Sequence, residues 1–183
     1  MKLYRTICLT VCMFVFCGSI HAQKNTVGTL WGLSEIGISY GRVIKENTFL
    51  LTGIHLETGE AFAGRTKMPG AAASFTWNTI FARKESGNGN EIRFFAGPGA
   101  AVGYCKDIRL QKSEHGLLGA YFGLKGRLGM EIIYDRKINI SICVAPVLGL
   151  HIARDMSGNL LARYYRYGLL QTIMPEIGIC YRF

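Results

Sequence analysis

The chain has 183 residues, of which 49% are hydrophobic and 18% are charged, and its formal net charge is +9. These values exclude a disordered polyelectrolyte and predict a single domain that buries a sizeable apolar surface in protein or in lipid. The sequence also combines 23 glycines with 10 Phe and 9 Tyr residues. Glycine weakens ordinary helices and strands while aromatic rings need a place to pack, so this combination is a first indication of a barrel.

Residues 1–22 have the layout of a cleaved secretory signal peptide. Lys2 and Arg5 precede an apolar run over 7–16, and small and polar residues then lead to a cleavage site. The apolar run is too short to anchor the chain as a membrane-spanning helix. We therefore expect an exported protein with one domain over 23–183.

A lipoprotein is the alternative interpretation of this segment, with Cys17 as the acylated residue. Phe14 and Phe16 stand where such a signal has small or aliphatic residues, so a cleaved peptide is favoured. Cleavage leaves three cysteines, namely Cys105, Cys143 and Cys180. An odd number excludes a framework of paired disulfides. The last two share a face of sequential strands, where a disulfide is conceivable and two packed thiols are favoured.

Apolar and small or polar residues alternate with a period of two through most of the remaining chain. This pattern predicts strands at 26–33, 35–44, 48–57, 70–83, 91–104, 117–133, 138–151 and 165–183. The first of them has the weakest alternation. No 18-residue apolar segment follows the signal, so a membrane span would have to consist of strands. An even number of strands lets an antiparallel meander close on itself.

Short polar turns and longer connections alternate along this series. The short ones are 45–48, 84–90 and 134–137, and the long ones are 58–69, 105–116 and 152–164. This alternation is typical of a barrel with one trimmed rim and one elaborated rim. The connection between the first two strands is an exception, because it is too short for the elaborated rim.

The second face of the strands decides between a soluble barrel and a membrane barrel. A soluble barrel would present Lys, Glu, Thr and Gln there, whereas this face is mostly Gly, Ala and Ser with a few charges of both signs. The charged members are Arg93, Lys125, Arg127, Glu131, Glu176 and Arg182. Small residues and mixed charges suit the narrow interior of an eight-stranded barrel. The sequence therefore predicts an all-β, eight-stranded, antiparallel up-and-down transmembrane barrel with its apolar face toward lipid.

Aromatic and proline residues refine this prediction. Aromatics near strand ends would form interfacial girdles; they are Tyr40, Trp77, Phe81, Tyr104 and Tyr181. Three prolines, Pro98, Pro146 and Pro175, fall on the lipid-facing side within predicted strands. Because proline cannot donate to a β-ladder, we expect local bulges at these positions.

The final strand, 165–183, carries apolar residues at every second position back from a terminal Phe, which puts Tyr165 and Tyr167 on its lipid-facing side. With the signal and the alternating strands, this layout resembles the small outer-membrane barrels of Gram-negative bacteria, of the OmpA membrane-domain and OmpX kind. The resemblance implies an outer-membrane location and recognition of the last strand by the barrel-assembly machinery. It would give an assembly role to Phe183, Tyr181, Ile179 and Ile177.

The interior charges have two interpretations, a network of hydrogen-bonded ion pairs or the lining of a narrow, porin-like pore. The network is favoured because an unpaired buried charge is costly. The long connections could face outside and contact a surface partner or anionic lipopolysaccharide, although a solvated rim is favoured. A secreted soluble barrel that binds an apolar ligand remains a further alternative.

Catalytic, cofactor and metal sites are not predicted. None of the histidines of the mature chain, His55, His115 and His151, stands in the His-x-Ser pattern of a lipid A deacylase. No His, Cys and Asp cluster has metal-ligand spacing. No run of basic residues with interleaved aromatics indicates nucleic acid. We expect a non-enzymatic barrel with a structural or surface-interaction role.

Overall fold

A computed structural model describes residues 24–32, 35–58, 70–86, 90–107, 117–154, 157–170, 173 and 175–183. The predicted signal peptide lies outside these ranges, as does most of the connections 58–69 and 105–116. Within the described residues, no helix has the length and hydropathy needed to cross a membrane.

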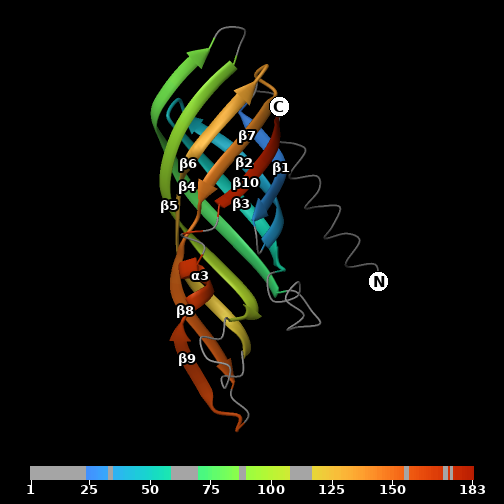
Figure 1. Cartoon of the computed structure of the whole chain (residues 1–183), viewed down its shortest axis with the longest axis vertical. Coiled ribbons are helices and arrows are strands. Elements are labelled where there is room, and N and C mark those ends of the chain that lie inside the picture. The colour runs from blue at the N-terminus through green and yellow to red at the C-terminus, as the bar shows by residue number, and fades with distance from the viewer. Residues whose placement is uncertain are drawn as a thin grey trace, which may run out of the picture.

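The described chain forms a closed antiparallel barrel of eight strands (Figure 1). The strand segments are β1 (Asn25–Gly32), β2 (Glu35–Lys45), β3 (Thr48–Glu57), β4 (Gly70–Ser86), β5 (Asn90–Lys106), β6 (Leu118–Tyr134), β7 (Ile138–Val144), β8 (Val147–Arg154), β9 (Leu160–Tyr164) and β10 (Pro175–Arg182). Segments β7 and β8 continue one another along β6. The predicted fold class is confirmed.

Both ends of the barrel wall meet in one seam. β1 pairs with β10 through seven residue pairs from Thr26↔Arg182 to Gly32↔Glu176. The seam is extended at one rim, where Asn25 and Phe183 donate their backbone N–H groups to each other's carbonyl oxygens at 3.1 and 2.9 Å. The first strand, which had the weakest sequence signal, is therefore an integral part of the wall. We call this end, which also carries the turn 135–137, the turn rim, and the opposite end the loop rim.

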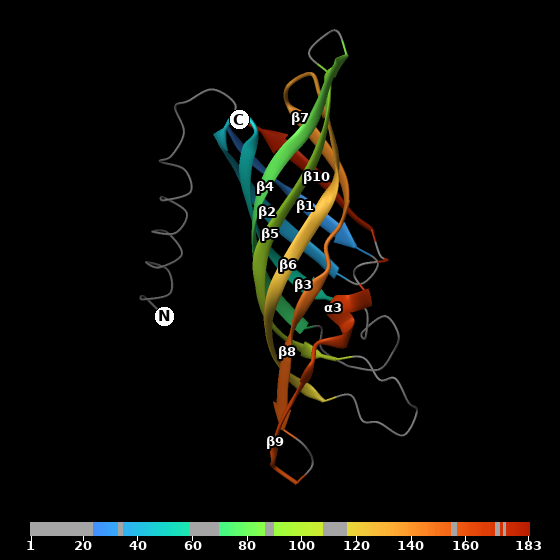
Figure 2. The ribbon, with the colours of Figure 1, turned by 90° about the vertical axis from the view of Figure 1, so that its left-hand side faces the viewer.

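The prediction of one strand over 165–183 is wrong in its first half. Residues Arg166–Leu170 form the short helix α3, and β10 begins only at Pro175. Proline has no N–H to continue a ladder, so it stands at the first residue of the strand. Figure 2 shows α3 beside β8 near the loop rim.

The expected long connection 152–164 is also different in the structure. β8 continues to Arg154, and β9 returns beside it from Leu160, so the segment is a hairpin extending the barrel beyond the loop rim. Pro146 separates β7 from β8, and its carbonyl oxygen still accepts the N–H of Gly126 at 2.9 Å. The proline therefore interrupts the strand without a gap in the backbone hydrogen bonding to β6.

The bulge expected at Pro98 is wrong. The β4–β5 ladder keeps one register on both sides of this proline, and its register shift lies between Ile80 and Ala82. On the β6 side, Pro98 stands opposite Gly126 within a regular ladder. Pro98 is tolerated because Trp77 and Asn78 of β4 have no partners in the β4–β5 ladder, although both pair with β3 on their other side.

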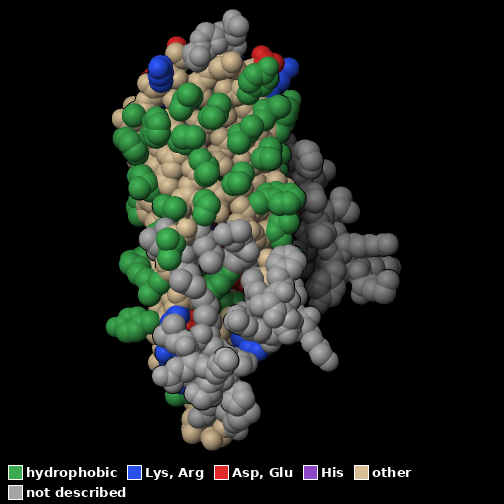
Figure 3. All heavy atoms as spheres, viewed as in Figure 1, with side chains coloured by type: hydrophobic (Ala, Val, Ile, Leu, Met, Phe, Trp, Pro, Cys, Tyr) green, Lys and Arg blue, Asp and Glu red, His purple; other side chains and the backbone are tan. Residues whose placement is uncertain are grey.

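On the face seen in Figure 3, apolar side chains cover the middle of the outer wall and charged side chains gather toward the two ends. Exposed apolar residues occur on every strand of the barrel, so we call them the apolar belt. The most exposed members of the belt include Ile38, Ile54, Leu124 and Leu148, each more than 60% exposed. Four of the five predicted girdle aromatics are exposed at 47–62%, and Tyr40 instead donates to Asn25 Oδ1 at 2.9 Å. An apolar exterior of this extent is typical of a surface in contact with lipid.

Candidate functional site: the filled lumen

The centre of the lumen is an ion-pair cluster around Glu176 of β10. Its Oε1 lies 2.8 Å from Nη2 of Arg127, and its Oε2 lies 3.8 Å from Nζ of Lys125. All three residues are at most 5% exposed. The Cys143 thiol lies between the same partners, 3.0 Å from Arg127 Nη2 and 3.4 Å from Glu176 Oε1. The Arg127 guanidinium also stacks over the Phe95 ring at 5.2 Å.

A second group of ion pairs fills the lumen toward the turn rim. Arg93 Nη2 lies 2.6 Å from Glu91 Oε2, and Arg93 Nη1 lies 3.5 Å from Glu131 Oε1. Asn139 donates to the other oxygen of Glu131 at 2.9 Å. A cavity of about 40 Å³ lies among these residues and reaches Arg127. It has space for a few water molecules.

A third group lies on the loop side of Glu176 and was missed from the sequence. Glu35 of β2 and His55 and Glu57 of β3 point inward and are at most 7% exposed. His55 Nε2 lies 2.8 Å from Ser74 Oγ. The signal that could have found them is the alternation of 35–44 and 48–57, which puts them on the same face as the interior glycines.

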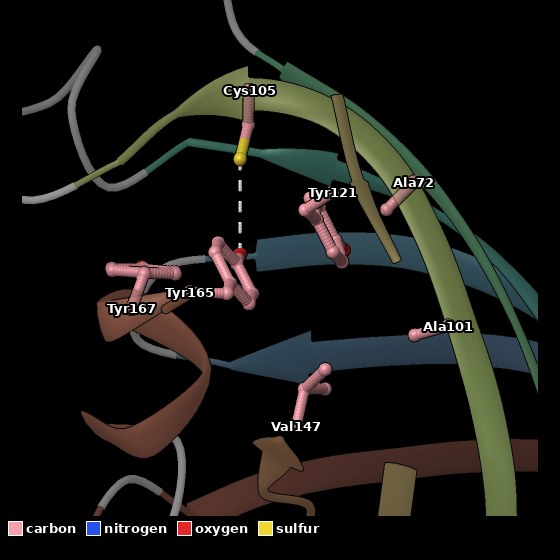
Figure 4. Packing of buried hydrophobic residues seen from close by; sticks show 7 residues of the cluster. All are labelled: Ala72, Ala101, Cys105, Tyr121, Val147, Tyr165 and Tyr167. Atoms are coloured by element: carbon pink, nitrogen blue, oxygen red, sulfur yellow. Dashed lines mark hydrogen bonds between the residues drawn. The ribbon is translucent and has the colours of Figure 1, made fainter. Parts of the chain in front are cut away.

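Stacked tyrosines cover this group toward the loop rim (Figure 4). Tyr121 and Tyr165 lie parallel with ring centroids 4.0 Å apart, and both hydroxyls donate to Glu57 Oε1 at 3.2 Å. The Cys105 thiol lies 3.7 Å from the Tyr165 hydroxyl. The predicted lipid-facing position of Tyr165 and Tyr167 is wrong, because both are buried in this cluster.

Tyr165 directly precedes α3 and Tyr167 lies in its first turn, and both are held inward because this turn is tied to Asp107, the residue after β5. The Asp107 carboxylate accepts the backbone N–H groups of Arg166 at 3.2 Å and Tyr167 at 3.0 Å. The N–H of Tyr165 donates to the Gly149 carbonyl at 2.9 Å. Two orphan donors of the helix are thus satisfied by a carboxylate, as in an N-cap.

All six charged residues predicted for the interior point into the lumen. Lys125, Arg127, Glu131 and Glu176 are buried, while Arg93 and Arg182 are half-buried. Among the described residues, Cys105, Cys143 and Cys180 are buried free thiols. All four residues of the predicted assembly signal lie on the outer wall and are 37–53% exposed; they are Phe183, Tyr181, Ile179 and Ile177. Their assembly role stays a prediction.

The chemistry available to the third group is limited by its surroundings. Ser74, His55 and Glu35 follow the order of nucleophile, base and orienting acid, but His55 is 1% exposed inside the wall. The distance of 3.9 Å from His55 Nδ1 to Glu35 Oε2 is also too long for the orienting hydrogen bond. A lipid ester on the outer wall has no contact with this serine hydroxyl, which faces His55.

Metal ligation would use Glu35, His55 and Glu176, whose ligand atoms lie within 4.8 Å of one another. Glu176 already pairs with Lys125 and Arg127, so a cation would compete with two fixed positive charges. This donor set therefore fits an ion-pair network better than a divalent metal.

Comparison with known proteins bears on the fold alone. No family model and no curated protein matches the chain. Among solved structures, the barrel is similar to the N-terminal β-barrel domain of OprF from Pseudomonas aeruginosa, with a TM-score of 0.53 and 11% identity over 89% of this chain and 100% of that one. A major outer membrane protein from Thermus thermophilus aligns over the same shares with a TM-score of 0.43 and 11% identity. The chain thus has the fold of a small outer-membrane β-barrel, as its last strand predicted.

Proposed function

We propose that this protein is a non-enzymatic barrel of the outer membrane with a structural or surface-interaction role and a lumen that does not conduct. The observation that carries the proposal is the filled cross-section at Glu176 of β10, where its carboxylate pairs with Arg127 and Lys125 of β6, across the intervening strand β7. The stacked pair Tyr121 and Tyr165 covers the same cross-section from the loop side.

The outer belt supports the membrane location. An apolar exterior around a polar interior is the reverse of a soluble barrel, which buries apolar residues inside. The turn rim would then face the periplasm and the loop rim the exterior. The likeness to an outer-membrane barrel domain supports the same location.

The two alternative functions, a narrow pore and a secreted barrel that binds an apolar ligand, each require a different interior from the one observed. A narrow pore would need a continuous polar path, whereas the stacked rings of Tyr121 and Tyr165 cover the charged groups toward the loop rim. A secreted barrel for an apolar ligand would need a large apolar cavity inside, whereas the described cavity near Arg127 has a volume of only about 40 Å³ and includes charged residues such as Arg93 and Glu131 in its lining.

Planar-bilayer recording tests the non-conducting lumen. Purified wild-type protein should give no steady ohmic current, and Tyr165→Ala combined with Arg127→Ala should show brief openings because two of the filling side chains are gone. Glu46→Ala, at the exposed turn rim, serves as the control and should behave as wild type. A steady conductance of the wild-type barrel would contradict the proposal.

Membrane fractionation tests the location independently. The full chain should appear in the outer membrane as a band whose migration changes on heating. Release with the soluble periplasmic fraction would favour the secreted-barrel alternative instead.

A further inference from the structure

The outer wall carries an apolar groove of about 730 Å³ across β4, β5, β6 and β8. Its floor is one hydrogen-bonded row that consists of Ser74, Ala101, Gly123 and Gly149. The side chains of this row point into the lumen, so the groove floor is backbone. Three spacings between neighbouring strands give the floor a length of about 14 Å.

The walls of the groove are outward residues that differ in size. Ala73 on β4 and Ala100 on β5 are short, while Phe122 and Leu124 on β6 and Leu148 on β8 stand beside them. Leu124 is 73% exposed. The groove lies within the apolar belt, so on the proposed location its surroundings are lipid chains.

Two basic side chains stand on the same outer face at the loop rim. Arg154 is four residues beyond Leu150 on β8, and Lys106 is four residues beyond Val102 on β5, which places both about 13 Å from the groove along the strands. Lys106 pairs across the ladder with Leu118, and the register Gly119↔Ala153 places Arg154 on the other side of Leu118.

The outer face of the β8–β9 hairpin, at the loop rim, is positively charged in the residues that the structure describes. The outward positions of β8 and β9 that the structure describes carry Arg154 and no acidic residue. Arg and Lys bind phosphate groups through charge-assisted hydrogen bonds. An anionic headgroup at this height would have its acyl chains directed along the wall toward the groove.

We propose that this surface is a binding site for one acylated, phosphate-bearing glycolipid of the outer leaflet, of the lipid A class. Arg154 and Lys106 hold a phosphate group at the loop rim, and one acyl chain lies across the backbone floor at Ala101 and over the short side chain of Ala100, beside Leu124. This inference rests on the proposed membrane location and names the lipid that the location offers.

Native mass spectrometry of the folded full chain in detergent tests the site, with lipid A as the probe and a zwitterionic phospholipid as the competitor. The wild-type barrel should retain one lipid A. Ala100→Phe, which fills the groove from the outside, should lower this retention at least fivefold. Ala96→Phe is the matched control, because it lies on the same strand and the same face outside the groove, and it should bind as wild type.

The headgroup contact has its own pair of variants. Arg154→Gln should weaken lipid A binding about fivefold to tenfold, whereas Arg163→Gln should not, because Arg163 pairs with the inward His151 on the opposite face of the hairpin. Heat-modifiable migration checks the folding of each variant. If Ala100→Phe does not fold, Ala73→Phe fills the same groove from β4.

Equal binding by wild type and the groove-filling variant would overturn the site. Loss of a dimer, rather than of lipid, in Ala100→Phe would assign the groove to a second copy and also overturn it. If the protein fractionates with the outer membrane but binds no lipid A, the lipid site is overturned and the proposed location stands. If the protein is found in the soluble fraction, the proposed location itself is rejected.

Discussion

The turn-side and loop-side halves of the barrel fill the lumen with different chemistry. On the turn side, β7, β10 and β1 close a regular wall, and the interior holds ion pairs such as Arg93 with Glu91. On the loop side the eighth strand, which consists of β9 and β10, is interrupted by α3, and Tyr165 at the start of this interruption lies over Glu57. Where the wall is regular, long side chains with paired charges fill the narrow interior. Where the wall is interrupted, the rings of Tyr165 and Tyr167 at the start of α3 fill the interior instead.

The largest expected effect concerns the seam of the turn-side half. Phe183→Asp should abolish assembly, because it places a charge on the outer face of the closing strand that the insertion machinery is expected to recognise. Outer-membrane fractionation and heat-modifiable migration measure it. Phe183→Tyr keeps the aromatic ring and should assemble. Normal insertion of the Asp variant would remove the assembly role from this residue.

The next effect concerns the central cluster that both halves share. Glu176→Ala leaves Lys125 and Arg127 buried without their carboxylate, so the free energy of unfolding should fall by about 3–5 kcal/mol. Urea titration of the barrel in lipid vesicles, followed by tryptophan fluorescence, measures this change. The matched control Glu46→Ala removes a carboxylate that is 86% exposed and should change stability by less than about 0.5 kcal/mol. Equal effects of the two variants would contradict a structural role for the cluster.

The smallest effect is confined to the loop-side half. Asp107→Ala removes the acceptor of two α3 amides and should cost about 1 kcal/mol, the usual value of an N-cap. Hydrogen exchange of the 166–170 amides should become several times faster, with β7 and β10 unchanged. Asp135→Asn at the turn rim is the control, since Asn accepts the positive φ of 48° found there. Faster exchange throughout the barrel would show that the two halves are not independent.

Most of the wall could be predicted from the sequence because strand alternation is a local signal. The predicted strands at 35–44 and 48–57 match β2 and β3 to within one residue. The predicted interior charges follow from the same alternation, which is why Glu131 and Glu176 were found. The error at 165–174 arose because Tyr165 and Tyr167 also fit a lipid-facing pattern, and nothing local shows that Asp107 binds the start of a helix there.

The contacts inside the lumen could not be predicted from the sequence, because they join side chains of different strands. His55 meets Ser74 across one ladder, and Tyr165 meets Glu57 over 108 positions of the chain. Such contacts depend on the register and closure of the barrel, which set the height of each inward residue.

By itself, the sequence determined the class of this protein, its lipid-facing belt and the chain position of Phe183, because a period of two and a terminal aromatic are properties of contiguous residues. Only the tertiary structure decided that Phe183 meets Asn25 in the seam, that Glu176 pairs with Arg127, and that the eighth strand is interrupted. The seam requires barrel closure, which brings the first and last strands together. The pair of Glu176 with Arg127 requires the registers of β10 and β6 on β7, and the interruption requires Asp107 to reach the start of α3.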